Sequence, residues 1–287
     1  MTFFQAIVIG LIQGIAELFP VSSLGQTVLI PSLIGASWSG LVAQQASPES
    51  PYLAFVVGLH VATSVALISV FWREWVGIVR GFFRSLVRRR VESADERLAW
   101  LILVATIPVG VLGLVLEHPL RTLFAKPLAA AFFLTVNGLV LLLGEWLVRR
   151  SARRGAPARE PSSLRVGDAL GIGIVQSSAL LAGISRDGVC MVAGLGRGLT
   201  RQDAARFSFL LSAPPIFAAG LYKLPDLMGP LGQGIRPQIL AGSVAAFVTA
   251  FLSTRLLMRY FRSGTLLPFA AFCLVFGIAC IIRFGVF

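Results

Sequence analysis

The chain has 287 residues, of which 56% are hydrophobic and only 13% are charged, whereas soluble domains carry roughly 25% charged residues. Its formal net charge is +12, from 25 basic and 13 acidic residues, and most of the basic residues are arginines that lie between apolar runs. This pattern excludes an ordinary soluble domain and predicts an all-α polytopic membrane protein, whose basic segments contact anionic membrane lipid rather than nucleic acid.

The first apolar run, 3–34, contains a polar island from Gln13 to Gln26. Glu17 is the only formally charged residue among the first 48 residues. A carboxylate at bilayer depth costs at least ~2.5 kcal/mol on insertion scales, so it marks a candidate functional site. Gln13 and Glu17 share one helix face, and Pro20 then interrupts the helix. We therefore expect 3–34 to form a broken, re-entrant hairpin that lines a polar pocket.

The later apolar runs are long enough to cross a bilayer, which takes about 17–25 residues. His60 lies inside the first of them, and a lone histidine there is more typical of a hydrogen-bonding packing residue than of a catalyst. Cys190, Cys273 and Cys280 lie in apolar context without metal-ligand spacing and are interpreted as small core residues. The six predicted spans are 52–72, 98–116, 128–148, 205–222, 238–258 and 264–284.

The arginines predict the orientation of these spans. No Lys or Arg precedes Arg73. By the positive-inside rule, the arginine-rich segments are cytoplasmic loops, and the N-terminus is outside. The predicted cytoplasmic segments are 73–97, 149–165, 197–206 and 255–262, and the predicted outer segments are 35–51, 117–127 and 223–237.

The first interrupted segment occurs a second time at 167–195. In the second copy the charges Arg186 and Asp187 follow the shared serine. Three predicted spans, an odd number, separate the two hairpins, so the hairpins would enter from opposite faces and bring their tips, 20–26 and 183–188, together near the bilayer middle. A chance likeness between Gly-rich and Ala-rich helices is the alternative. An offset of 163 residues pairs Ala6 with Ala169, Gly10 with Gly173, Gln13 with Gln176, Ala16 with Ala179, Leu18 with Leu181, Ser22 with Ser185 and Gly25 with Gly188.

These observations predict one membrane domain with six transmembrane helices and two re-entrant helical hairpins. Its two inverted-repeat halves would be 1–148 and 166–287, joined by the solvated basic linker 149–165. The sequence does not fix the oligomeric state, and a homodimer stays an open alternative.

The predicted pocket combines groups suited to phosphate chemistry. The planar guanidinium of Arg186 matches a phosphate, and backbone N–H groups near the neighbouring glycines would turn toward the same anion. Glu17 is a candidate general base or, with Asp187, a metal ligand, and Ser23 is a candidate nucleophile. An ion pair of Arg186 with Glu17 or Asp187 that only locks the hairpins is the alternative. The candidate substrate-binding residues are Gln13, Ser22, Gln26, Gln176, Gly183, Ser185 and Asp187.

Two motifs carry a family resemblance. Gln13 to Gln26 is similar to the pattern E/Q-G-x-T-E-F-L-P-x-S-S-x-G-H, and Ala182 to Gly188 is similar to P-G-x-S-R-S-G. Over essentially its full length, the chain resembles the undecaprenyl-diphosphate phosphatase family of the bacitracin-resistance type.

The resemblance implies hydrolysis of a C55 polyprenyl diphosphate to the monophosphate lipid carrier of cell-wall synthesis. It also implies support by a divalent cation, Mg²⁺ or Ca²⁺, in the inner (plasma) membrane of a bacterium. By the same resemblance Glu17 is the essential glutamate, Ser23 the nucleophile and Arg186 the phosphate-binding arginine.

The chain departs from both motifs. Gln26 replaces the histidine that ends the first motif, Ala182 replaces the proline of the second, and Asp187 replaces its second serine. Glutamine cannot take up a proton near neutral pH. We therefore expect slow turnover if the family histidine activates the serine, unless Asp187 compensates. Two alternatives stay open: a non-catalytic polyprenyl-phosphate binder or transporter (a flippase), and a phosphatase for a different lipid diphosphate.

Overall fold

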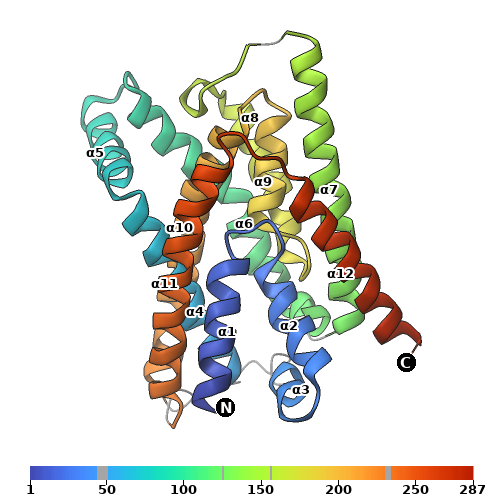
Figure 1. Ribbon diagram of the computed structural model, residues 1–287. Coiled ribbons are helices and arrows are strands. Elements are labelled where there is room, and N and C mark those ends of the chain that lie inside the picture. Colours follow the sequence, from blue (N-terminus) through green and yellow to red (C-terminus); the bar gives the residue numbers. More distant parts are fainter. Residues whose placement is uncertain (44–50, 125, 156, 230–233, 287) are drawn as a thin grey trace.

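The chain folds into helices joined by turns (Figure 1). A computed structural model describes residues 1–43, 51–124, 126–155, 157–229 and 234–286. Over these residues the predicted all-α class is confirmed, and the only β-type pairing is an isolated bridge between Arg159 and Leu199. In chain order the helices are α1 (Phe3–Ala16), α2 (Ser23–Ile34), α3 (Ala36–Ala43), α4 (Pro51–Val70), α5 (Trp72–Arg88), α6 (Ala94–Phe124), α7 (Pro127–Arg153), η2 (Pro161–Ser163), α8 (Val166–Gln176), η3 (Ser177–Leu180), α9 (Arg186–Leu195), α10 (Arg201–Met228), α11 (Arg236–Tyr260) and α12 (Leu267–Val286).

Four of the described helices are long and apolar enough to cross a membrane: α6 over Ala94–Leu116, α7, α11 and α12. Three of them contain the predicted spans 98–116, 128–148 and 238–258, and α12 overlaps most of 264–284, which fits a multi-pass membrane protein. A fifth span results if α4 and α5, which are bent by 88° relative to each other, are counted together. The predicted span 205–222 lies within α10. The full set of six spans stays a prediction.

The two interrupted segments form helical hairpins. The pair α1–α2 occupies the lower half of Figure 1, the pair α8–α9 the upper half, and the two bends face each other at mid-height. The backbone N–H of Gly183 donates to Ser22 Oγ at 3.1 Å, which joins one bend to the other. The predicted meeting of the two tips is therefore confirmed.

Residues related by the 163-residue offset have the same structural tasks. Ser22 caps α2 by accepting a hydrogen bond from the Gly25 N–H at 3.2 Å, and Ser185 caps α9 by accepting one from the Gly188 N–H at 3.1 Å. A serine at this position satisfies a backbone donor that the helix itself cannot pair.

Small residues also recur at the offset and set the packing of the hairpins. A Cβ atom at Gly10 would lie 2.3 Å from the Gly242 carbonyl oxygen of α11, and one at Gly173 would lie 2.4 Å from the Ala105 carbonyl oxygen of α6. Such close backbone contacts are typical of helix packing in membranes. Each hairpin therefore rests directly on the backbone of a long neighbouring helix.

The segment predicted as a basic loop after the first span is instead largely the helix α5. Its exposed apolar residues Trp72, Val76, Val79, Phe83 and Leu86 follow heptad spacing along one stripe. Buried residues on another side of the helix pack against α6. Arginines every four to seven residues obscured this pattern in the sequence, since they suggested a solvated loop. An amphipathic, arginine-rich helix is typical of the membrane surface.

The linker between the halves is also more ordered than predicted. Helix α7 continues to Arg153. The backbone N–H of Arg159 donates to the Gly198 carbonyl at 2.9 Å, and its guanidinium lies 3.4 Å from Asp168 Oδ2. Arg159 is therefore attached to the second half, while 157–165 is otherwise mostly exposed or half-buried, and the solvated linker stays a prediction.

Candidate functional site

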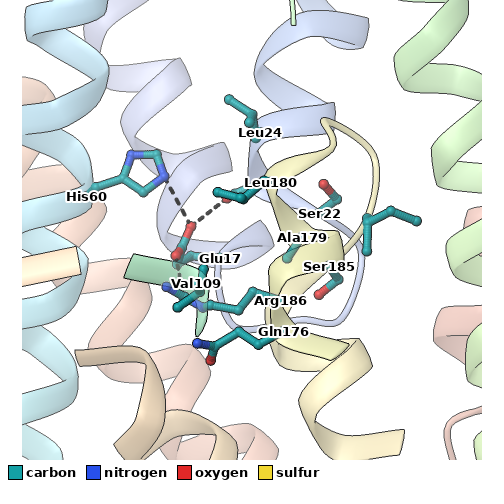
Figure 2. A pocket seen from close by; sticks show the side chains of 12 residues that line it. Glu17, Ser22, Leu24, His60, Val109, Gln176, Ala179, Leu180, Ser185 and Arg186 are labelled. Carbon is teal, nitrogen blue, oxygen red and sulfur yellow. Dashed lines mark hydrogen bonds and ion pairs between the residues drawn. The ribbon is translucent and has the colours of Figure 1, made fainter. Parts of the chain in front are cut away.

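A cavity of about 180 Å³ lies between the two hairpin bends, with further walls from α4 and α6 (Figure 2). We call it the hairpin pocket. One part of its surface is polar and the other apolar. Its polar lining consists of Glu17, Ser22, Ser23, His60, Gln176, Ser185 and Arg186, and its apolar lining of Leu24, Val109, Ala179, Leu180 and Ile184.

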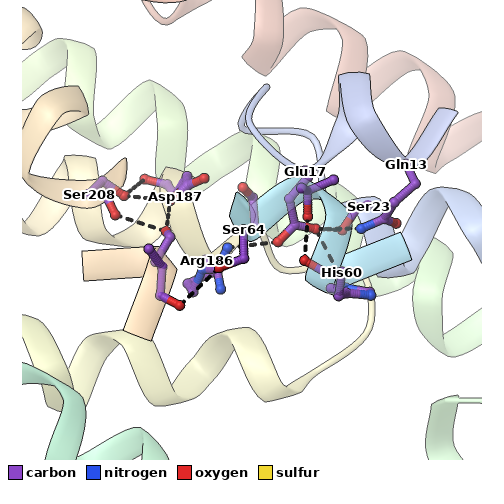
Figure 3. Close-up of polar contacts among 12 residues, drawn as sticks. Gln13, Glu17, Ser23, His60, Ser64, Arg186, Asp187 and Ser208 are labelled. Carbon is purple, nitrogen blue, oxygen red and sulfur yellow. Dashed lines mark hydrogen bonds and ion pairs between the residues drawn. The ribbon is translucent and has the colours of Figure 1, made fainter. Parts of the chain in front are cut away.

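Glu17 is the centre of the polar contacts (Figure 3). It follows the last residue of α1, and Gln13 Nε2, one turn earlier, donates to its Oε2 at 2.9 Å. Ser23 Oγ donates to the same oxygen at 2.5 Å, and Arg186 Nη2 donates to Oε1 at 2.7 Å. The three predicted catalytic residues are thus brought together. Glu17 is only 7% exposed, so these donors replace water around its charge.

Ser23 and Arg186 reach Glu17 from equivalent places. Ser23 is the first residue of α2, Arg186 is the first residue of α9, and the 163-residue offset pairs the two positions. The N-terminal ends of two helices therefore point toward one site, and such ends favour bound anions. The Arg186–Glu17 ion pair considered from the sequence is present.

Several buried polar atoms around this centre lack a partner. Among the described residues, Gln13 Oε1, Gln176 Nε2 and Arg186 Nε are buried without a hydrogen bond. Buried polar groups are normally paired, with protein or with ordered water. Gln176 and Arg186 also line the hairpin pocket, so these two unpaired donors belong to side chains at its wall.

His60 lines the hairpin pocket, a position that the sequence interpretation as a packing residue did not give it. Its Nδ1 lies 2.9 Å from the Val56 carbonyl oxygen, and its Nε2 lies 3.5 Å from Glu17 Oε2. A carbonyl oxygen can only accept, so Nδ1 carries the hydrogen, and Nε2 faces Glu17. The signal in the sequence was an ionisable residue inside an apolar run, but nothing local placed it beside the first hairpin.

Asn137 of α7 was missed altogether, although it holds both bends. Its Nδ2 donates to the Pro20 carbonyl at 2.8 Å, and its Oδ1 accepts from the Ser185 N–H at 2.9 Å. The side chain is fully buried. The signal was again a polar residue in the middle of a predicted span.

Of the seven predicted substrate-binding residues, Ser22, Gln176 and Ser185 line the pocket, and Gln13, Gly183, Gln26 and Asp187 do not. Gln26 is buried, and its Nε2 donates to the Val21 carbonyl at 3.0 Å inside the first hairpin. Asp187 Oδ1 accepts hydrogen bonds from Ser208 at 2.7 Å and Ser212 at 2.5 Å on α10. Neither is among the described residues that line the hairpin pocket. Asp187 therefore joins α9 to α10 through the hydroxyl groups of these two serines.

The expected anion cradle of glycine N–H groups was wrong in its details. The N–H groups of Gly183 and Gly188 donate to Ser22 Oγ and Ser185 Oγ, respectively. Gly183 has φ +108°, and a Cβ there would lie 2.4 Å from the Ala130 carbonyl oxygen, so only glycine fits. These glycines shape the bend, and the donors available to an anion are side chains.

The residues present fit a divalent cation only if the substrate shares in binding it. Among the described residues, no group of three or more His, Cys, Asp and Glu side chains could hold a metal ion. Mg²⁺ in phosphate sites is commonly bound by one or two carboxylates together with substrate phosphates and water. Glu17 can serve in this way, but the predicted pair of Glu17 with Asp187 is not found in the pocket.

Comparisons with known proteins show which family the chain is similar to. The family described as bacitracin resistance protein BacA matches residues 6–279. Undecaprenyl-diphosphatase 2 of Frankia alni is 50% identical over 100% of this chain and 99% of its own length. Undecaprenyl-diphosphatase of Mycolicibacterium paratuberculosis is 52% identical over 98% of this chain and 97% of its own length. A third relative, undecaprenyl-diphosphatase of Acidiphilium cryptum, is 42% identical over 96% of both chains.

Proposed function

Because the chain belongs to the bacitracin resistance protein BacA family, we propose that it hydrolyses undecaprenyl diphosphate to the monophosphate and inorganic phosphate. The observation that carries this proposal is the convergence of Ser23 and Arg186 on Glu17 in a pocket between two helix N-termini. A hydroxyl, a carboxylate and a guanidinium within hydrogen-bond reach are the parts that a phosphoryl-transfer site requires.

In the proposed reaction, Ser23 Oγ attacks the terminal phosphorus while its proton passes to Glu17, to which it already donates a hydrogen bond. The bond between this phosphorus and the bridging oxygen breaks, and the monophosphate lipid leaves with the electron pair. Water then attacks the phosphoserine. Glu17 gives its proton to the departing Ser23 oxygen and takes a proton from the attacking water. Inorganic phosphate is released, and the proton on Glu17 then passes to solvent.

The remaining polar groups are assigned by position. The free Nε of Arg186 and the Nε2 of Gln176 would donate to phosphate oxygens, where charge develops as the leaving group departs. His60 positions Glu17 from the α4 side. A divalent cation held between Glu17 and the diphosphate would neutralise phosphate charge. Ser22 and Ser185 keep the hairpin bends in shape.

For the whole chain we propose six transmembrane helices and two re-entrant hairpins, α1–α2 and α8–α9, in two inverted halves, 1–148 and 166–287. Broken helices whose tips meet are the device that membrane proteins use to build a site at mid-membrane depth. The N-terminus would lie outside a bacterial inner membrane, with the pocket open to the outer face and α5 against anionic lipid of the inner face.

The test is phosphate release from C55 diphosphate by the purified protein with Mg²⁺ or Ca²⁺. We expect Glu17→Gln to lower turnover by about 10²-fold or more, since it removes a positioned base. The matched control is Glu74→Gln, because Glu74 pairs with Arg206 outside the pocket and should leave turnover near that of the parent.

If the parent releases no more phosphate than Glu17→Gln, the proposed hydrolysis is wrong. Retained binding of the lipid phosphate would then favour the binder or transporter alternative. Release from a shorter lipid diphosphate but not from the C55 substrate would favour a different lipid.

A further inference from the structure

A second cavity adjoins the hairpin pocket behind its polar wall. It has a volume of about 210 Å³ and lies between α4 and α10, and we call it the α4–α10 groove. It shares His60 and Arg186 with the hairpin pocket. The rest of its lining is apolar, including Val57, Ile216 and Ala219.

The walls of this groove are fixed by local chemistry. Ser64 Oγ of α4 donates to the Ala213 carbonyl of α10 at 3.1 Å. A Cβ at Gly220 would lie 2.1 Å from Val61 Cγ2, so the two helices are in direct contact at that level. Ala219, beside it, is exposed, which opens the groove to the surroundings of the molecule.

The geometry points to the α4–α10 groove as the binding site of the first isoprene units of the lipid substrate. This inference rests on the proposed function and adds the position of the hydrocarbon chain. A polyprenyl diphosphate changes from charged to apolar at a single bond, between the inner phosphate and the first isoprene unit. Arg186 and His60 form the matching boundary, with polar partners for phosphate on one side and apolar side chains on the other.

The distribution of polar groups favours placing the prenyl chain, and not a phosphate, in the α4–α10 groove. Apart from the two shared residues, the described lining of the groove has no charged or hydrogen-bonding side chain, so a phosphate placed there would lose its partners. The inner phosphate would meet the free Nε of Arg186, and the terminal phosphate would reach Ser23 in the hairpin pocket.

The experiment compares substrates with and without a prenyl chain. Ala219→Trp would fill the exposed part of the groove. For farnesyl diphosphate and C55 diphosphate we expect its KM to rise at least tenfold, with kcat little changed. Hydrolysis of methyl diphosphate, which has no chain to place, should stay within about twofold of the parent. Val109→Trp is the comparison variant, because Val109 lines the hairpin pocket from α6.

Two outcomes would overturn the inference: equal effects of Ala219→Trp on prenylated and methyl diphosphates, or a chain-selective effect in Val109→Trp alone. A second measurement does not depend on these variants. A farnesyl phosphonate analogue with a photoreactive group in its first isoprene unit should cross-link the parent at Val57 or Ile216. Cross-links confined to α6 and η3 would overturn the inference. Failure of the proposed hydrolysis would appear separately, as no phosphate release by the parent from any diphosphate.

Discussion

Glu17 is the residue on which the site depends. It accepts hydrogen bonds from Gln13, Ser23 and Arg186, with His60 beside it, so a charge that is costly in an apolar environment is compensated on several sides. Glu17, Ser23 and Arg186 were predictable from the sequence, because charge, helix interruption and spacing are local properties. The place of His60 was not, because it depends on how α4 packs against the first hairpin.

The replacement of the motif histidine by Gln26 has a different meaning in the structure than in the sequence. Gln26 points into the first hairpin, while His60 lies beside Glu17. We therefore expect Gln26→His to leave phosphate release within about threefold of the parent. His60→Leu should lower kcat by about tenfold, because an interaction with a charged group is worth about 1.5–3 kcal/mol.

His60→Gln is the conservative control for this prediction. Its amide keeps a polar group that can donate toward Glu17, so it should recover part of the activity lost in His60→Leu. A large gain of turnover in Gln26→His would show that the side chain at this position reaches the substrate. Equal activities of His60→Leu and the parent would remove His60 from the mechanism.

At the scale of elements, the two hairpins owe their shape to residues that recur in both. Ser22 and Ser185 cap the second helix of each hairpin. Gly10 and Gly173 allow the first helix of each hairpin to pack closely against the backbone of a neighbouring helix. The repeat in the sequence therefore predicted real structural equivalence. It could not predict Asn137, which has no counterpart in the motif and reaches both bends from α7.

Asn137→Ala should weaken both folding and catalysis. It leaves the Pro20 carbonyl and the Ser185 N–H buried without their partner, at about 1–3 kcal/mol for each group. We expect a lower midpoint of thermal unfolding in detergent, and a fall of kcat even at temperatures where the variant is folded, because Ser23 and Arg186 lose their relative placement.

Thr254→Val is the matched control for Asn137→Ala. Thr254 is also fully buried, but its hydroxyl donates only to the Ala250 carbonyl of its own helix, α11. It should change the unfolding midpoint much less and leave kcat unchanged. If Asn137→Ala lost stability but kept the kcat of the parent, Asn137 would be a packing residue without influence on the site.

At the scale of the whole molecule, long-range contacts bind the halves together in ways that local patterns do not reveal. Glu145 of α7 is 2% exposed, and its carboxylate accepts from Arg201 of α10 at 2.6 Å and from the Leu266 N–H before α12 at 3.4 Å. Hydropathy predicted the helices that carry these groups. It could not predict which helices would be neighbours, since this depends on a few buried polar pairs.

The proposed orientation leads to a test on the intact chain. All three native cysteines are buried, so an introduced cysteine can be labelled against a low background. Ser37, on α3 after the first hairpin, and Ser163, in the basic linker, are both exposed. We expect Ser37→Cys to react with a membrane-impermeant maleimide in intact cells, and Ser163→Cys to react only after the membrane is opened. The arginines of 149–165 favour the cytoplasmic side, whereas no basic residue before Arg73 opposes an outer location. The reverse labelling pattern would place the hairpin pocket on the opposite side of the membrane.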